Sequence, residues 1–327
     1  MKAFEYAAPG DLDDAIALLS DTPGDTAVMA GGTDLVTSMK QGLVSPNRVV
    51  SLKNVKTISG IEKAGSGLRI GAGTTLNELL AHPGVADEFP AIATAIKGIC
   101  SPQLTSVGTV GGDLLQAPRC WYYRNGMGLL ADDAGAANFD GDSLAVEGDN
   151  RYHAIFDNSK AQFVNASSLA PALLALGTKV VIRGPKKKER EVAIADLYKT
   201  PASSDEREHV VGGDEVISHI VVAGGATRNA TYEVRTRQGL DWPIVTASVA
   251  ISGSGNASVV LGHVAPTPYI AHAAGEVLSK GSVDEAAAKA AGDAAAEGAT
   301  PLSHNEYKVT LVKVAVKRAA MAAAAHG

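Results

Sequence analysis

The sequence predicts an α+β protein built in two parts, and three observations support this fold class. The chain has 327 residues, about twice the ~150 residues of a typical domain. Its first half alternates short helix and strand patterns around glycine turns, and its second half has a run of strand patterns followed by helices. Strands and helices separated in this way are typical of α+β proteins. We expect a first part over residues 1–205 and a second over 210–327, divided by the polar tract Ser203 to Glu208.

The composition indicates which classes of partner the chain does not bind and in which compartment it is expected. A formal net charge of −6 leaves no basic surface of the kind that binds nucleic acid. The two cysteines, Cys100 and Cys120, are too few for a disulfide framework or a four-cysteine cluster. No stretch approaches the ~18 apolar residues of a membrane span, and the N-terminus lacks the apolar core of a signal peptide. We expect a cytoplasmic chain with no membrane span and no nucleic-acid partner; export with a signal-bearing partner stays open.

The first half is predicted to contain a strand, a glycine turn and a helix in direct succession. Asp11 begins a helix whose apolar residues recur at helical spacing. A strand at residues 26–30 then leads through Gly31-Gly32-Thr33 into a helix that Asp34 opens. Ser101-Pro102 enforces a break after a later helix. The other predicted elements are strands at 48–52 and 68–71, helices at 76–80, 89–98 and 169–176, and a strand hairpin at 179–183 and 191–194.

An irregular stretch and a meander of strands complete the predicted organisation. Between residues 116 and 165 the periodicity fades, and a loop this long within a domain is usually functional or an insertion. The second part is predicted to form a four-stranded antiparallel meander followed by three helices. The strands are expected at 215–222, 230–237, 244–252 and 257–264, and the helices at 269–280, 284–296 and 305–324.

The most informative motif is the glycine turn in Val28-Met-Ala-Gly-Gly-Thr-Asp-Leu35. Glycines let a backbone approach a phosphate closely, and the free N–H groups of the turn can donate to a diphosphate. The Walker pattern and the dinucleotide G-x-G-x-x-G pattern are both absent from this loop, which argues against an ATPase or a simple NAD dehydrogenase. Taken alone, a Gly-Gly turn between a strand and a helix is more often structural.

A second glycine stretch, Ser106-Val-Gly-Thr-Val-Gly-Gly-Asp113, repeats the same device. Two such loops in one domain could hold the two halves of a dinucleotide diphosphate. The histidines have no metal-ligand spacing, and no G-x-S-x-G elbow presents a nucleophile. We therefore predict a ligand-binding domain without an acid–base catalytic residue or a metal site.

Five segments of the chain resemble segments of a known family, and they follow one another in the same order as in that family. They are Ala30 to Leu35, Ile70-Gly-Ala-Gly-Thr-Thr-Leu76, Ser101-Pro-Gln-Leu104 leading into Gly108-Thr-Val-Gly-Gly112, Leu261-Gly-His-Val-Ala-Pro-Thr-Pro268, and Pro301-Leu-Ser-His-Asn-Glu-Tyr-Lys308. The chain resembles the FAD-binding medium subunit of the molybdenum hydroxylases, which include xanthine dehydrogenase, carbon monoxide dehydrogenase and aldehyde oxidoreductase.

The resemblance implies a fold and a set of cofactor contacts. The fold is a two-subdomain FAD-binding domain of the PCMH, vanillyl-alcohol-oxidase-like type, with subdomains at about 1–55 and 56–205. A C-terminal domain like that of carbon monoxide dehydrogenase flavoproteins would follow at 210–327. FAD would be held noncovalently. The implied cofactor-binding residues are Val28, Met29, Ala30, Gly31, Gly32, Thr33, Asp34, Leu35, Gly108, Thr109, Gly111, Gly112, Asp113, Gln116, Ser168 and Ile217.

The resemblance also implies partners. A molybdopterin-binding large subunit would carry the molybdenum cofactor, and a small subunit would carry [2Fe-2S] clusters. Electrons would pass from those clusters to FAD and then to an external acceptor. The sequence identifies neither the substrate at molybdenum, nor the terminal acceptor, nor the oligomeric state. Two alternatives stay open, a stand-alone FAD oxidoreductase of the same fold and a degenerate flavin-free assembly subunit.

Several residues depart from the family's pattern. Gln116 to Arg124 and Asn150 to Phe156 resemble the branch with an inserted loop at about 116–165, which includes 4-hydroxybenzoyl-CoA reductase and often holds a [4Fe-4S] cluster on four cysteines. No cysteine follows Cys120 here, so we predict no such cluster and a structural Cys120. Asp113 replaces the usual Asn, Ser168 an Asp, and Glu233 a Lys. Their effect on FAD affinity and potential is not fixed by the sequence.

Overall fold

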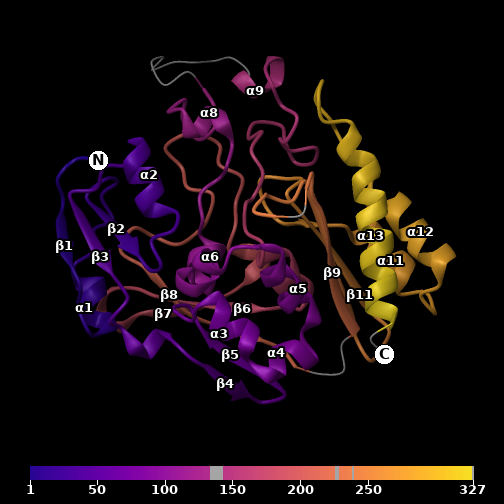
Figure 1. Cartoon of the computed structure of the whole chain (residues 1–327), viewed down its shortest axis with the longest axis horizontal. Coiled ribbons are helices and arrows are strands. Elements are labelled where there is room, and N and C mark those ends of the chain that lie inside the picture. The colour runs from indigo at the N-terminus through magenta and orange to yellow at the C-terminus, as the bar shows by residue number, and fades with distance from the viewer. Residues whose placement is uncertain (133–142, 225–227, 238, 326–327) are drawn as a thin grey trace.

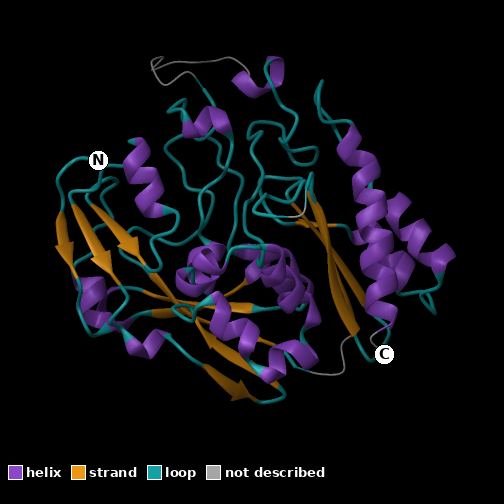
Figure 2. Ribbon diagram, viewed as in Figure 1, coloured by secondary structure: helices purple, strands orange, loops and turns teal. Residues whose placement is uncertain are grey.

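The computed structural model describes residues 1–132, 143–224, 228–237 and 239–325, whose strands form three sheets (Figures 1 and 2). The strands are β1 Glu5–Ala7, β2 Thr26–Met29, β3 Arg48–Ser51, β4 Ile61–Ala64, β5 Gly67–Gly71, β6 Lys179–Arg183, β7 Glu189–Ala193, β8 Val216–Val222, β9 Arg228–Val234, β10 Val245–Ile251, β11 Ala257–Gly262 and β12 Tyr269–Ile270. The helices are α1 Leu12–Ala17, α2 Leu35–Gln41, α3 Leu76–Ala81, α4 Pro83–Glu88, α5 Pro90–Gly98, α6 Pro102–Val107, α7 Val110–Leu114, α8 Trp121–Arg124, α9 Leu144–Glu147, α10 Ala170–Ala175, α11 His272–Leu278, α12 Glu285–Ala295 and α13 Tyr307–Ala325.

The first sheet is small and parallel, in the order β1-β3-β2. Asp11 caps α1, since its side chain accepts from the N–H groups of Asp13 and Asp14. Leu12 and Ile16 of this helix pack against Val50 in a small core. The predicted cap and the predicted strands at 26–30 and 48–52 are confirmed to within a residue or two. This subdomain places the end of β2 and the start of α2 at the glycine turn.

The second sheet has the order β4-β5-β8-β6-β7 and is antiparallel throughout. β8 is its central strand, pairing with β5 on one side and β6 on the other. The sequence analysis placed residues 215–222 in the C-terminal meander, and that assignment is wrong. The strand is apolar on both faces, so its pattern does not tell which of two sheets it joins.

The third sheet has the order β12-β11-β10-β9, with α11, α12 and α13 packed beside it (Figure 1). It is a four-stranded antiparallel sheet as predicted, but its fourth strand is the short β12 rather than β8. The three predicted helices are confirmed. β10 is buried along its whole length, because α13 packs near one face and α10 of the first domain near the other.

The predicted insert at 116–165 contains two short helices, α8 and α9; residues 133–142, between them, lie outside the described part of the chain. Its second half packs on the C-terminal domain rather than on the first. The N–H groups of Ile155 and Phe156 both donate to the Val264 carbonyl, at 2.8 and 3.1 Å. Nowhere in the described residues is a helix long and apolar enough to cross a membrane.

Candidate functional site

The loop between β2 and α2 presents a row of unused backbone donors. Gly32 has a φ of +74°, a conformation that an L side chain rarely adopts. The five consecutive N–H groups of residues 31–35 have no acceptor among the described residues. Thr33, in the middle of this row, is exposed. Such a row of backbone N–H groups is a ready anion site, because each can donate to a phosphate oxygen without a charged side chain.

The two glycine stretches meet in space. A Cβ atom on Gly31 would lie 2.0 Å from the carbonyl oxygen of Val107, so the loops touch at a position that admits no side chain. The predicted segment Ile70 to Leu76 supports the second stretch from behind, since the N–H groups of Val110 and Gly111 donate to the carbonyls of Thr74 and Ala72. The sequence therefore located both loops, and the fold brings them together.

The second stretch does not offer the donors that we predicted for it. Residues 110–114 form the short helix α7, with Thr109 as its cap. The N–H groups of Gly108, Val110, Gly111, Gly112 and Asp113 all bond to acceptors within the chain. Among the described residues only the N–H of Thr109 is left over in this stretch. Its glycines serve close packing, with Gly111 against Ala72, and among the described residues the free backbone donors lie mainly in the first loop.

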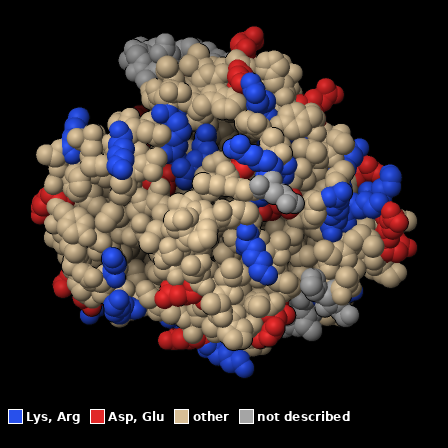
Figure 3. Space-filling view, viewed as in Figure 1, with Lys and Arg blue, Asp and Glu red and all other residues tan. Residues whose placement is uncertain are grey.

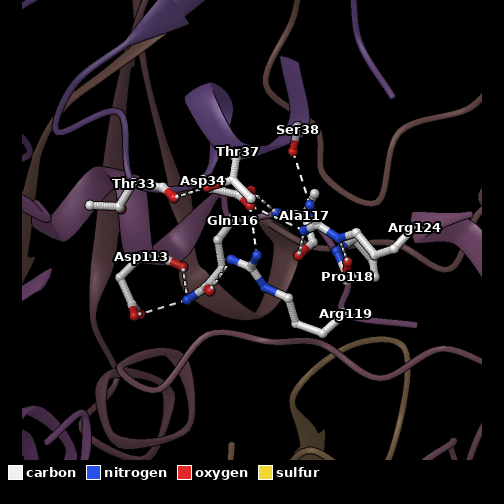
Figure 4. Close-up of polar contacts among 10 residues, drawn as sticks. All are labelled: Thr33, Asp34, Thr37, Ser38, Asp113, Gln116, Ala117, Pro118, Arg119 and Arg124. Carbon is white, nitrogen blue, oxygen red and sulfur yellow. Dashed lines mark hydrogen bonds and ion pairs between the residues drawn. The ribbon is translucent and has the colours of Figure 1, made fainter. Parts of the chain in front are cut away.

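The Asp34 carboxylate is held by a cluster of polar contacts with the segment 117–124 (Figure 4). Its carboxylate accepts from Arg119 at 2.8 Å, from Arg124 at 3.1 Å and from the N–H of Ala117 at 2.9 Å. Arg124 also donates to the Ser38 hydroxyl, at 2.9 Å, and so joins the segment to α2. The Asp34 carboxylate is therefore occupied by residues 117–124, and a cofactor contact through the backbone N–H of Asp34 stays a prediction.

Asp113 and Gln116 form a second, buried set of contacts. Asp113 accepts from the Ser167 hydroxyl at 2.5 Å and from the N–H of Leu169 at 3.0 Å. Its other oxygen accepts from the Gln116 amide at 3.0 Å, and the Gln116 carbonyl accepts from Arg119 at 3.0 Å. Burial raises the pKa of Asp113, although the Ser167 hydroxyl and the backbone N–H groups of Ser168 and Leu169 act in the opposite direction. The carboxylate that stands in place of the usual Asn therefore binds backbone and hydroxyl groups of residues 167–169.

A cavity of about 260 Å³ lies beside Arg119, between the insert and the C-terminal domain. Its walls include the aromatic side chains of Trp121, Tyr152, Phe163 and Trp242, and the Arg119 guanidinium lies 4.7 Å from the Trp242 ring centre. Figure 3 shows a hollow in this view of the molecule with Lys and Arg side chains around it. The combination of aromatic walls and a guanidinium suits a planar ring.

Three of the residues lining this cavity are titratable groups that stay uncharged. Burial lowers the pKa of His153 to about 4 and that of His263 to about 3, so both imidazoles are neutral near pH 7. Burial raises the pKa of Cys120, whose sulfur lies 3.1 Å from Nε2 of His153. The thiol and the imidazole thus share a hydrogen bond between two uncharged groups. This neutral pair agrees with the predicted structural role of Cys120, which stays a prediction.

The remaining predicted contacts lie deeper in the fold. Ile217 is 2% exposed and belongs to the core of the second sheet, and Ser168 is buried beside Asp113. Glu233 forms an ion pair of 2.6 Å with Arg235, and both are almost buried. No group of three or more His, Cys, Asp or Glu side chains in the described residues is placed to hold a metal ion. Roles for Ser168 and Ile217 toward a cofactor stay predictions.

Comparison with known proteins identifies the family. Residues 2–222 match the model of the FAD binding domain in molybdopterin dehydrogenase, and residues 230–323 match that of the CO dehydrogenase flavoprotein C-terminal domain. This chain belongs to the FAD-binding subunits of the molybdenum hydroxylases. It is 29% identical to the aldehyde oxidoreductase FAD-binding subunit of Escherichia coli, over 96% of each chain. It is 27% identical to the carbon monoxide dehydrogenase medium chain of Afipia carboxidovorans, over 97% of this chain and 95% of that one.

Solved structures agree with this assignment. Carbon monoxide dehydrogenase from Hydrogenophaga pseudoflava matches with a TM-score of 0.77 and 25% identity, over 99% of this chain and 98% of that one. Quinoline 2-oxidoreductase from Pseudomonas putida shares the fold, with a TM-score of 0.75 at 24% identity over 99% of each chain. The N–H groups of residues 31–35, which have no acceptor among the described residues, are donors of the kind that a diphosphate such as that of FAD accepts from.

Sequence reasoning missed the residues that support this loop. Arg119 and Arg124 lie in the predicted insert, and nothing in the segment Gln116 to Arg124 showed that it folds back on Asp34. Two arginines five positions apart, close after a glycine-rich stretch, are a weak signal for an acidic or anionic partner. Trp242 had no signal in the sequence, whereas His263 lies in the segment Leu261 to Pro268, whose pattern did not show that it lines a cavity beside Arg119.

Proposed function

We propose that this chain is the electron-transfer subunit of a heterotrimeric molybdenum hydroxylase. It would take electrons one at a time from the [2Fe-2S] clusters of a small partner subunit and pass them in pairs to an external acceptor. A large partner subunit would hold the molybdenum cofactor and oxidise the substrate. The observation that carries the proposal is the row of five free N–H groups at residues 31–35, in a chain whose whole length matches FAD-binding medium subunits.

The chain's own residues would bind and orient the cofactor. The N–H groups of Gly31 to Leu35 would donate to the diphosphate, and the Thr33 hydroxyl and the N–H of Thr109 would add donors at its edges. FAD supplies the redox chemistry, accepting single electrons and releasing two together. Among the described residues around the first loop we assign no acid or base to the reaction, because Asp34 and Asp113 are both held by protein donors.

The structure weakens the motive for a flavin-free subunit. That alternative arose partly from Asp113, whose carboxylate would repel a diphosphate if it faced one. Its oxygens instead accept from Ser167, Leu169 and Gln116, so the charge is already held by donors. We infer noncovalent FAD binding and a cytoplasmic location, with two cysteines that the structure leaves as free thiols.

An absorbance spectrum of the purified full chain tests the cofactor assignment. We expect flavin bands near one per chain that pass into the supernatant after acid precipitation, because the binding is noncovalent. A colourless chain that also takes up no added FAD would contradict the assignment. An iron–sulfur shoulder in the spectrum would contradict the prediction that no [4Fe-4S] cluster is present.

Co-purification tests the partner assignment. We expect a tagged chain, expressed with its neighbouring genes, to recover one subunit that contains molybdenum and one that contains iron. The recovered complex should reduce its flavin when a substrate of the molybdenum subunit is added. If the chain binds FAD but reduces an organic substrate on its own, the stand-alone oxidoreductase is the better description.

A further inference from the structure

The carboxylate of Asp34 is turned away from its own helix. An Asp at the start of a helix ordinarily accepts from the first backbone N–H groups, but α2 has no side-chain cap bond at this residue. The carboxylate instead accepts from the N–H of Ala117, which is 83 residues later in the chain, and from Arg119 and Arg124. The last part of the diphosphate loop is therefore fixed by a segment distant in sequence.

The two arginines have different surroundings. Arg124 donates to the Pro118 and Ala117 carbonyls and to Ser38, all within α2 and the segment itself. Arg119 reaches further, donating to Asp34 and to Gln116 while stacking over Trp242 of the C-terminal domain. The Arg119 side chain thus contacts the diphosphate loop, the Asp113–Gln116 pair and the C-terminal domain at the same time.

We propose that Arg119 and Asp34 act as a positioning pair, which holds the loop at residues 31–35 in the shape that binds the diphosphate of FAD. This inference rests on the proposed function and adds the residues that set its affinity. Both terminal nitrogens of Arg119 are engaged by protein acceptors, at 2.8 and 3.0 Å. It therefore acts through Asp34 rather than as a direct counter-charge to the phosphates.

Charge-changing variants separate positioning from simple counter-charge. Asp34→Asn removes a negative charge beside the loop, so a counter-charge model expects tighter FAD binding. A positioning role predicts weaker FAD binding instead. The amide cannot form the ion pair with Arg119, so the loop at residues 31–35 is no longer held in place. We expect Asp34→Asn and Arg119→Gln each to raise the dissociation constant of FAD about 10- to 100-fold. The double variant should be about as weak as the worse single variant, because each single variant already removes the ion pair between Asp34 and Arg119.

The readouts are flavin fluorescence titrations of the full-length apoprotein at two salt concentrations. The salt dependence of FAD binding should be the same in the wild type and in Arg119→Gln, since a residue that only positions the loop makes no ion pair with the phosphates. Arg119→Lys should recover part of the affinity by keeping the ion pair. FAD binding that is unchanged or tighter in Asp34→Asn would overturn the proposal, as would additive effects in the double variant.

Arg183→Gln serves as the matched control. Arg183, the last residue of β6, is also partly buried and forms two ion pairs, with Asp13 and Glu189, neither of which belongs to the diphosphate loop. It should lose stability without losing FAD affinity. The thermal midpoints of all the apoproteins show whether a loss of FAD affinity reflects unfolding. If Arg183→Gln loses as much FAD affinity as the Asp34 and Arg119 variants for the same fall in midpoint, the positioning role is overturned. A wild type that binds no FAD overturns both this proposal and the proposed function, whereas normal binding by the variants overturns this proposal alone.

Discussion

At the scale of single residues, Lys308 is the most unusual ionisable group. It lies fully buried in the first turn of α13, and its ammonium donates to the carbonyls of Tyr152, His153 and His263, at 3.2, 2.9 and 2.6 Å. Burial lowers its pKa to about 7. Above that pH the folded chain has released a proton that the unfolded chain keeps up to ~10.4. The free energy of unfolding should therefore rise with pH across this window.

Lys308→Met should remove that rise. Urea unfolding at pH 6.5, 8 and 9.5 measures it. We expect the wild type to gain stability from the lowest to the highest pH relative to the variant, with a limiting slope of about 1.4 kcal/mol per pH unit. The variant should be less stable at every pH, because three carbonyls lose a donor. Parallel pH profiles for the two proteins would show that the lysine keeps its ordinary pKa.

At this scale the residue types of the site could be predicted, but their bonding partners could not. Gly31, Thr33 and Asp34 were located from a local motif, because a strand, a turn and a helix follow one another directly. What Asp34 and Asp113 bond to could not be predicted, since their partners lie 83 and 54 residues away. Arg119 was missed for the same reason. A side chain's partner depends on the tertiary fold, and local pattern carries no information about it.

At the scale of elements, the contact between the two glycine loops makes a specific prediction. Gly31→Ala would place a methyl group 2.0 Å from the Val107 carbonyl, so the loops must separate. We expect a loss of stability of about 1–3 kcal/mol, typical of overpacking, and weaker FAD binding because the N–H row shifts. Gly10→Ala is the control, because its Cβ would meet nothing within 4 Å. Thermal melts and FAD titrations measure both; equal behaviour of the two variants would rule the contact out.

Elements with a strong local signal were predicted well, and those without one were not. Thr75 begins α3 with a complete capping box, and the C-terminal helices follow clear apolar spacing. α7 was missed because its sequence, Val-Gly-Gly-Asp-Leu, has poor helix propensity; the cap at Thr109 and packing against Ala72 override that preference. β8 was predicted as a strand but assigned to the wrong sheet, since its pairing with β5, more than 100 residues earlier, and with β6 is set by the tertiary fold.

At the scale of the whole molecule, the two domains are interleaved. β8 follows the polar tract at 203–208 yet forms the centre of the second sheet, between β5 and β6. Conversely, the insert precedes that tract yet packs on the C-terminal domain. Asn305 of that domain donates to the carbonyls of Asn150, His153 and Ala154, each at 3.2 Å. Ile155 and Phe156 lie in the C-terminal core. The chain should therefore unfold as one cooperative unit.

Truncation tests this interleaving directly. A fragment ending at residue 210 lacks β8, which leaves the β4-β5 and β6-β7 pairs without the strand that joins them. We expect it to show no cooperative thermal transition by circular dichroism, because an isolated two-stranded pair is at best marginally stable. A fragment ending at residue 224 keeps β8 and should melt cooperatively, at a lower temperature than the full chain since Ile155 and Phe156 lose their partners. A cooperative melt of the shorter fragment would instead place an independent folding boundary before β8.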